Sequence, residues 1–273
     1  MSQLPPVFQF SQNNLQDYVD CPRRFQLRYV VGQRWPAIES EPLLEYEHLL
    51  EQGEHFHLLV QRHILGIPAE RLMPDKPLLA QWWENYLNSP PPDLPTGKRL
   101  PELQLSTPID EQRLMAKFDL VALDPGERAV IVDWKTGQRR PGRWLDRRLQ
   151  SRVYPYVLVE AGTHLFGGPI TPERVSMVYW FAEAPNNPEI LRYTAEQHAV
   201  NHDSLRRLIE EIIRRGDEEW DKTETLDHCK YCVYRSLCDR GVRAGALEEV
   251  GLEALDWKKD FDFDLDSVEE IAF

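Results

Sequence analysis

Two aspartates and a lysine near the middle of the chain have the residue types and the spacing of a metal-dependent site for phosphodiester hydrolysis. Asp119 lies in one apolar stretch, and Asp133 and Lys135 follow it at the end of a second stretch, Ala-Val-Ile-Val. Residues 124–127 read Asp-Pro-Gly-Glu, a turn signal because proline fixes φ and glycine tolerates positive φ. The sequence therefore predicts a β-hairpin that can bring the three side chains together.

The register of this hairpin decides whether the carboxylates meet. A loop with an odd number of residues, centred on the glycine of the turn, places Asp119 directly across from Asp133, with Cβ atoms about 5 Å apart. An even loop would place them on opposite faces of the sheet. The first strand, near 113–123, is expected to alternate its faces without interruption, which puts Phe118 and Leu120 together on the face opposite Asp119.

Two carboxylates that close repel each other unless a divalent cation lies between them. Oxygen ligands with few competing thiolates favour Mg²⁺ or Mn²⁺. Lys135, two residues beyond Asp133, emerges on the same face and can hold the scissile phosphate or the attacking water. An Asp-x-Lys tripeptide alone is more often a solvated strand end. The surrounding residues have to decide between these interpretations.

The residues after the lysine reverse the charge of the chain. The whole chain has a net charge of −13, yet residues 135–152 carry seven basic side chains against a single acid. A helix beginning after Pro141 aligns four polar side chains on one stripe, namely Arg143, Arg147, Gln150 and Tyr154. Phosphate binding explains this reversal directly, although a solvated basic helix face has the same composition.

Together these motifs resemble the PD-(D/E)XK nucleases of the RecB-like branch, whose motifs read roughly G-x-x-x-H, G-x-x-D, D-x-K-T-G and Q-x-x-x-Y. The chain matches them at residues 53–57, at Asp119, at residues 133–137 and at residues 150–154. One departure is Ala116, which stands where the family usually has glycine and removes no ligand. The resemblance implies a restriction-endonuclease-like α/β core, with a mixed central sheet flanked by helices.

The resemblance also implies a role for each matching residue. The metal ligands would be His57, Asp119, Asp133 and the carbonyl of Trp134. The catalytic residues would be Asp119, Asp133, Lys135, Gln150 and Tyr154, of which the last two would face the DNA. Separately, the basic charge of this span leads us to expect four arginines to bind DNA, namely Arg139, Arg140, Arg143 and Arg147. Periodicity does not choose between His55 and His57, but the glycine spacing of the family motif selects His57. Glu102, on an expected strand near 102–107, is a further acid that stays outside this ligand set.

The cysteines form a second pattern, with Cys21 far from Cys229, Cys232 and Cys238. Without a signal peptide or an apolar run of about 18 residues, the chain is expected to be cytoplasmic, where structural disulfides are rare. Four thiolates that must meet then indicate a metal site, and zinc and a [4Fe-4S] cluster both accept them. The Cys21 segment resembles that of RecB-like nucleases with a [4Fe-4S] cluster, such as AddB and the CRISPR-associated RecB-like exonucleases. The resemblance favours the cluster, which would clip the N-terminal segment to the C-terminal one.

With 273 residues and a hydrophobic content of 42%, the chain can bury one large core. Helices are expected near 42–65, 76–88, 146–161 and 195–215, and strands near 102–107, 113–123, 128–134, 174–181 and 189–193. Residues 1–243 would form the nuclease domain that encloses the cysteine site, and residues 244–273 an acidic tail.

The tail carries ten acids against two lysines. Residues 260–266 alternate acidic with apolar side chains, which suits an amphipathic interaction segment or a disordered tail. Its end looks similar to the acidic, phenylalanine-terminated tails of bacterial single-stranded-DNA-binding proteins. The tail could therefore dock into a helicase or another protein partner, or fold back over the basic stripe and compete with DNA. No membrane partner is expected.

The expected function is a metal-dependent DNA exonuclease that acts on single strands or DNA ends in repair, recombination or CRISPR adaptation. The chain has no P-loop, so unwinding would need a partner. The alternative is a catalytically weak, DNA-binding iron–sulfur adaptor in a repair complex. A redox sensor, whose DNA affinity would change with cluster oxidation, is a third interpretation.

Overall fold

The computed structural model describes residues 4–5, 7–33, 41–137, 145, 148–216, 219–230 and 232–241, without the side chains of 41–47. The acidic tail, 244–273, lies outside the described residues. The helices are α1 Gln12–Asp20, α2 Pro22–Phe25, α3 Glu41–Ile64, α4 Pro77–Asn88, α5 Gln150–Ala161, α6 Thr163–Phe166 and α7 Ala195–Arg214. The strands are β1 Gln9–Ser11, β2 Lys98–Pro101, β3 Gln104–Ile109, β4 Gln112–Lys117, β5 Leu120–Asp124, β6 Arg128–Lys135, β7 Val175–Phe181 and β8 Glu189–Arg192.

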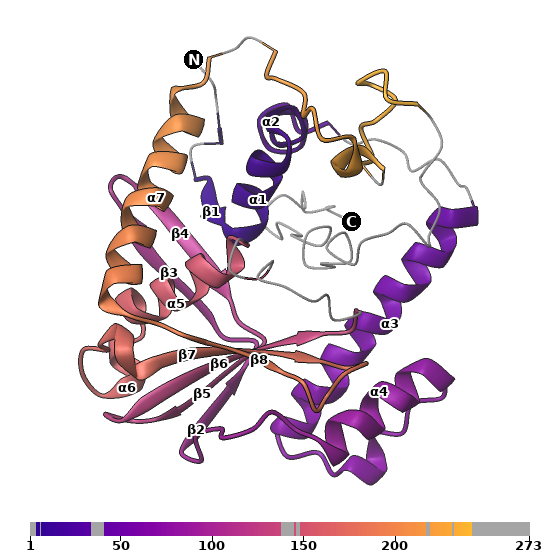
Figure 1. The fold of residues 1–273 in the computed structure, drawn as a ribbon, viewed down its shortest axis with the longest axis vertical. Helices are drawn as coiled ribbons and strands as arrows, with labels where there is room; N and C mark the ends of the chain where they lie inside the picture. The colour runs from indigo at the N-terminus through magenta and orange to yellow at the C-terminus, as the bar shows by residue number, and fades with distance from the viewer. Residues whose placement is uncertain are drawn as a thin grey trace, which may run out of the picture.

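The strands form two mixed sheets with helices on both sides (Figure 1). The larger sheet has the strand order β2-β5-β6-β7-β8, in which only β6 and β7 run parallel. The smaller sheet has the order β1-β4-β3, with β1 parallel to β4. The mixed α/β architecture agrees with the predicted fold class, although the strands divide between two sheets.

Two hydrophobic cores cover the two faces of the larger sheet. Strand β6 shows why, because Ala129 and Ile131 enter the core on the α5 side, whereas Val130 and Val132 enter the core on the α3 side. A strand that is buried on both faces reads as an unbroken apolar run instead of an alternating one. We call these the α5-side core, which also holds residues of α1 and α7, and the α3-side core, which also holds residues of α4. Each buried large side chain contributes on the order of 1.5–3 kcal/mol to folding.

The predicted strand over 113–123 is wrong, because the chain leaves the smaller sheet after β4 and enters the larger sheet at β5. Phe118 packs in the α5-side core, whereas Leu120 packs in the α3-side core. An unbroken strand would place both side chains on one face. The break at Phe118 and Asp119 lets the neighbouring Val121 return to the α5-side core. The carboxylate at the break therefore sits where the two sheets part.

The other predicted elements agree with the structure to different degrees. The expected helices at 42–65, 76–88 and 195–215 are confirmed as α3, α4 and α7. The helix expected from residue 146 is α5, which begins at Gln150, while residues 146–147 lie outside the described part. The sequence interpretation missed β1, β2, α1, α2 and α6. A capping box between Ser11 and Asn14 starts α1, and that Ser-x-x-Asn spacing was a readable signal.

The N-terminal helices lie beside the segment that follows α7, as Figure 1 shows. The ring of Phe25 stacks on that of Trp220, with centroids 5.7 Å apart, and the side-chain oxygen of Gln26 accepts a hydrogen bond from the backbone N–H of Trp220. Side-chain contacts thus pack together two segments that are almost two hundred residues apart. None of the helices in the described part of the chain combines the length and apolar composition of a membrane span.

Candidate active site

The β5–β6 hairpin has the odd, three-residue loop on which the predicted site depends. Its strands pair from Asp124 with Arg128 to Leu120 with Val132, so the loop is centred on Gly126. Gly126 has a φ of 78°, a conformation that glycine adopts without steric cost. One further step in this register places Asp119 opposite Asp133, as predicted.

The carboxylate of Asp119 is buried and held on both sides. Its Oδ2 accepts a hydrogen bond of 2.9 Å from the backbone N–H of Trp134, and its Oδ1 lies 3.4 Å from Nδ1 of His57. His57 projects from α3 and is 5% exposed, whereas His55 is exposed. The structure therefore brings His57, and not His55, to the aspartate.

Asp133, Lys135 and Gln150 form a closed polar triangle. The Nζ of Lys135 lies 2.8 Å from Oδ2 of Asp133 and donates to Oε1 of Gln150 at 3.0 Å. The amide nitrogen of Gln150, at the start of α5, donates to Oδ1 of Asp133. Because this amide contacts both charged groups, it fixes their relative position and satisfies atoms whose burial would otherwise be costly.

Two further residues support the lysine and are absent from the sequence-based prediction. Tyr179 pairs with Asp133 across β6 and β7, and the Lys135 ammonium lies 5.6 Å from the centroid of its ring. Burial raises the pKa of Tyr179 well above its usual value, and the nearby Asp133 charge raises it further, so the phenol stays neutral. Its hydroxyl meets Oγ of Ser151 at 2.8 Å. Ser151 could have been found from the sequence because it follows Gln150 directly. Tyr179 could not, because the pairing of β6 with β7 has no local sequence pattern.

The remaining predicted site residues are two buried aromatic residues and four arginines. Tyr154 is 3% exposed and packs its ring on Phe118 in the α5-side core, which differs from the expected position facing DNA. Trp134 places its ring in the α3-side core. The four arginines predicted to bind DNA, Arg139, Arg140, Arg143 and Arg147, lie outside the described residues.

Glu102 lies near His57 and Asp119, although the sequence interpretation left it outside the ligand set. Donor atoms of His57, Glu102 and Asp119 all lie within 4.8 Å of one another. One imidazole and two carboxylates are a donor set that suits Mg²⁺ or Mn²⁺, so these residues fit a divalent cation. Asp133 is not one of these three residues, and its oxygens contact the lysine and the glutamine of the triangle.

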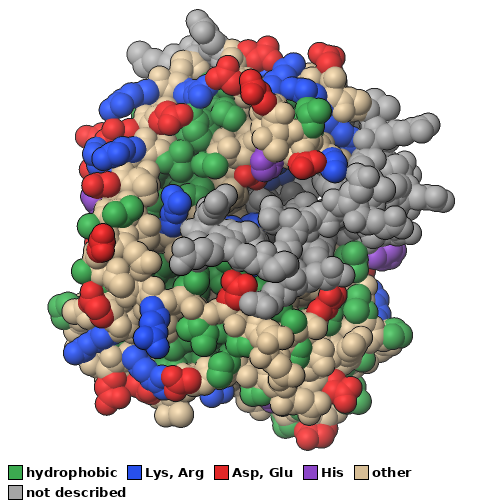
Figure 2. All heavy atoms as spheres, in the orientation of Figure 1, with side chains coloured by type: hydrophobic (Ala, Val, Ile, Leu, Met, Phe, Trp, Pro, Cys, Tyr) green, Lys and Arg blue, Asp and Glu red, His purple; other side chains and the backbone are tan. Residues whose placement is uncertain are grey.

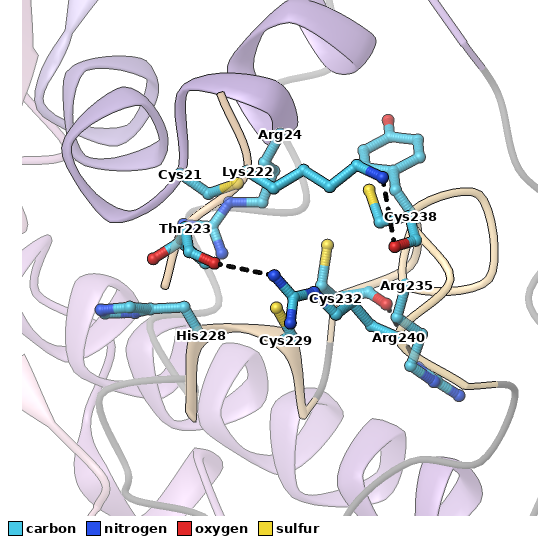
Figure 3. A pocket seen from close by; sticks show the side chains of 11 residues that line it. Cys21, Arg24, Lys222, Thr223, His228, Cys229, Cys232, Arg235, Cys238 and Arg240 are labelled. Atoms are coloured by element: carbon cyan, nitrogen blue, oxygen red, sulfur yellow. Dashed lines mark hydrogen bonds between the residues drawn. The ribbon is translucent and has the colours of Figure 1, made fainter. Parts of the chain in front are cut away.

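The four cysteines line one pocket (Figure 3). Cys21 follows α1, and Cys229, Cys232 and Cys238 come from the C-terminal segment; all four are free of disulfides. Burial raises the pKa of each of the three C-terminal thiols, and the charges of neighbouring cysteines raise it further. A bound cation would relieve this mutual repulsion. Basic side chains line the same pocket, and they are Arg24, Lys222, Arg235 and Arg240.

The face of the molecule drawn in Figure 2 mixes acidic and basic side chains along α7. Ion pairs account for part of this mixture, because Glu210 contacts both Arg206 and Arg214 on that helix. Exposed pairs at this spacing neutralise each other. The α7 surface therefore offers DNA no uniformly basic stripe.

The domain is α/β, and two buried carboxylates, a histidine and a lysine meet where its two mixed sheets part. This arrangement is typical of hydrolases that act on phosphodiesters. The sequence comparison is more specific, since residues 9–239 match the profile of the PD-(D/E)XK nuclease superfamily. The chain belongs to this superfamily. No curated protein matches the sequence.

Solved structures give a distant likeness of the whole fold. One is a "Putative exonuclease" from Eubacterium rectale, with 15% identity, a TM-score of 0.50 and coverage of 82% of this chain and 87% of the other. Another, SSO0001, has 14% identity and a TM-score of 0.45 over 87% of this chain and 88% of the other. The Eubacterium rectale structure indicates that the two proteins have the same type of fold.

Proposed function

We propose that the protein is a divalent-metal-dependent DNA exonuclease of the RecB-like branch, acting on single strands or DNA ends. The observation that carries this proposal is the buried pair of Asp119 and Asp133, with Lys135 in contact with Asp133, in a chain of the PD-(D/E)XK superfamily. The structural neighbour described as a "Putative exonuclease" supports attack from an end over internal cleavage.

In this proposal the ligands of the cation include His57, Asp119, Asp133 and the Trp134 carbonyl. A bound Mg²⁺ or Mn²⁺ would lower the pKa of a water molecule and neutralise charge on the phosphate. Lys135 contributes a positive charge beside that phosphate, at a position set by its contacts with Asp133 and Gln150. The α5 start thereby orients the two charged groups before substrate arrives.

DNA affinity is assigned to the basic span 139–147, with Arg139, Arg140, Arg143 and Arg147 as phosphate contacts. Phosphate contacts fix position without reading sequence, so binding should weaken steeply as salt rises. An exonuclease that digests any sequence needs no more than this.

We further propose that the four cysteines hold a [4Fe-4S] cluster, with zinc as the less favoured occupant. Support comes from their shared pocket, from the absence of disulfides among them, and from the basic side chains that would offset the charge of four thiolates. The cluster's role is structural, because it would join the segment after α1 to the segment after α7. Iron analysis and the visible spectrum of anaerobically purified protein would separate the two occupants.

The experiment that tests the proposed function compares linear and circular single-stranded DNA of the same length. With Mg²⁺ or Mn²⁺, end-labelled linear strands should be digested, circles should survive, and EDTA should stop the reaction. Cleavage of circles would show an endonuclease. Binding of DNA without cleavage of either form, with either metal, would overturn the proposal in favour of the DNA-binding iron–sulfur adaptor.

A further inference from the structure

Three acids lie in one row across three neighbouring segments of the chain, at the place where the two sheets part. The β2–β5 and β3–β4 pairings share a single register, in which Pro101 faces Leu120 and Gln104 faces Lys117. The same register places Glu102 opposite Asp119 at the break between the sheets. The β5–β6 register places Asp133 on the other side of Asp119. The middle acid therefore has a carboxylate neighbour on each side.

The backbone fixes Glu102 against Asp119. The N–H of Glu102 donates a 3.0 Å hydrogen bond to the carbonyl of Asp119, and the carbonyl of Leu103 accepts a hydrogen bond from the N–H of Phe118. The segments that contain these two residues each pass from one sheet to the other at this point. Their side chains therefore lie where the two sheets part and not within a flat strand. His57 reaches the same point from α3, and its ring nitrogen lies 3.4 Å from Oδ1 of Asp119.

Both outer acids of the row contact a lysine ammonium, but Asp133 also has a second donor, on its other oxygen. Each of its oxygens contacts a donor of the triangle, namely the Lys135 ammonium or the Gln150 amide. Glu102 instead has a donor atom within 4.8 Å of those of His57 and Asp119. Of the three acids in the row, the outer one that shares the histidine's surroundings is Glu102.

We propose that Glu102 is a further ligand of the divalent cation, beside His57 and Asp119 and in addition to the other ligands of the proposed function. This rests on the proposed function, in which the site holds Mg²⁺ or Mn²⁺. The added carboxylate increases the negative charge around the cation, and hard cations gain affinity with each added carboxylate. Asp119, between Glu102 and Asp133, then connects the cation to the triangle that positions Lys135.

Lys117 makes this proposal testable. Its Nζ lies 2.8 Å from Oε2 of Glu102, and its side chain is 44% exposed. The ammonium contacts the carboxylate that a cation would use, so lysine and cation compete for it. If the pair were only a surface ion pair, removing either partner would leave cation affinity unchanged. If Glu102 is a ligand, loss of the two partners must move cation affinity in opposite directions.

The experiment is a Mn²⁺ titration of the full chain, followed by the electron paramagnetic resonance signal of free Mn²⁺. Glu102→Gln should weaken the site at the active centre about tenfold or more, and Lys117→Met should strengthen it several-fold. The gain from Lys117→Met should disappear when residue 102 is already Gln. Asp110→Asn is the matched control. Asp110 is an exposed acid between β3 and β4, and its φ of 50° is positive, as is the φ of 52° at Glu102.

Wild-type Mn²⁺ affinity in a folded Glu102→Gln protein would overturn the proposal. So would a Lys117→Met protein that binds Mn²⁺ no more tightly than wild type, a measurement that decides the matter even if the glutamine variant does not fold. The readout is independent of cleavage. Mn²⁺ binding that depends on Glu102 in a protein without nuclease activity would refute the proposed function alone, whereas an active nuclease with unchanged binding in Glu102→Gln would refute only the assignment of Glu102.

Discussion

Replacing Cys21 by serine tests whether the cysteine pocket joins the two ends of the domain. Cys21 and Cys229 are 208 positions apart in the sequence. If both bind one cluster, they close a loop of that length in the unfolded chain, and the loop-closure entropy amounts to about 5 kcal/mol. The substitution itself changes one atom, so a large loss of stability must come from the opened loop and the lost ligand.

The value of about 5 kcal/mol is an upper estimate. Contacts such as the stacking of Phe25 on Trp220 already hold the two segments together in the folded state, and remnants of them reduce the entropy of the unfolded chain. For a domain of this size each kcal/mol lowers the melting temperature by roughly 2–4 °C. Cys21→Ser should therefore lower the melting temperature by up to roughly 10–20 °C.

The assay is thermal unfolding by circular dichroism, combined with iron and zinc analysis of anaerobically purified protein. Cys232→Ser should lower the melting temperature about as much as Cys21→Ser, and the double variant should be little worse, because one missing ligand from either end opens the same loop. Val19→Ser, at an exposed position nearby, is the control. A Cys21→Ser protein with wild-type melting temperature and metal content would refute the reasoning, as would fully additive losses in the double variant.

Three further predictions concern the site and the thiols. Gln150→Ala, which frees the aspartate and lysine of the triangle, should slow single-turnover cleavage about 10²-fold with DNA affinity nearly unchanged, and unaltered turnover would show that the amide does not position them. Burial raises the pKa of the three C-terminal thiols, so in metal-free protein these thiols should contribute to stability below about pH 8.5. That contribution should be lost as the pH rises through the raised pKa. Metal-loaded protein should not show this loss in thermal melts between roughly pH 7 and 10. Tyr179→Phe should cost about 1 kcal/mol of stability by denaturant titration, through loss of the hydrogen bond to Ser151, and a much larger cost would indicate a wider network.

The sequence predicted the hairpin because its information is local. The Pro-Gly turn sets the loop, the loop sets the register, and the register places Asp119 opposite Asp133. Every step involves residues within one short stretch of chain. The glycine spacing that selected His57 is equally local, and the structure places that histidine, and not His55, beside the aspartate.

The partners contributed by distant segments could not be read in the same way. Glu102 reaches Asp119 because β2 and β3 continue one register across two sheets, and Tyr179 reaches Asp133 because β7 pairs with β6 from forty residues away. Alternation within 113–123 also misled, because it carries no sign of the bend after Phe118. Such features arise from packing against two cores, and a single sequence records only that the residues are apolar.

The most direct test of the central claim is digestion of end-labelled single-stranded DNA in Mg²⁺ or Mn²⁺ by wild type, Asp133→Ala and Lys135→Ala, with DNA affinity measured on the same samples. Lys98→Ala, at an exposed lysine on β2, is the control. We predict that both site variants lose cleavage by at least about 10²–10³-fold while they keep their fold and most of their DNA affinity, and that the control cleaves like wild type. Full activity in both purified site variants would contradict the assignment of this site.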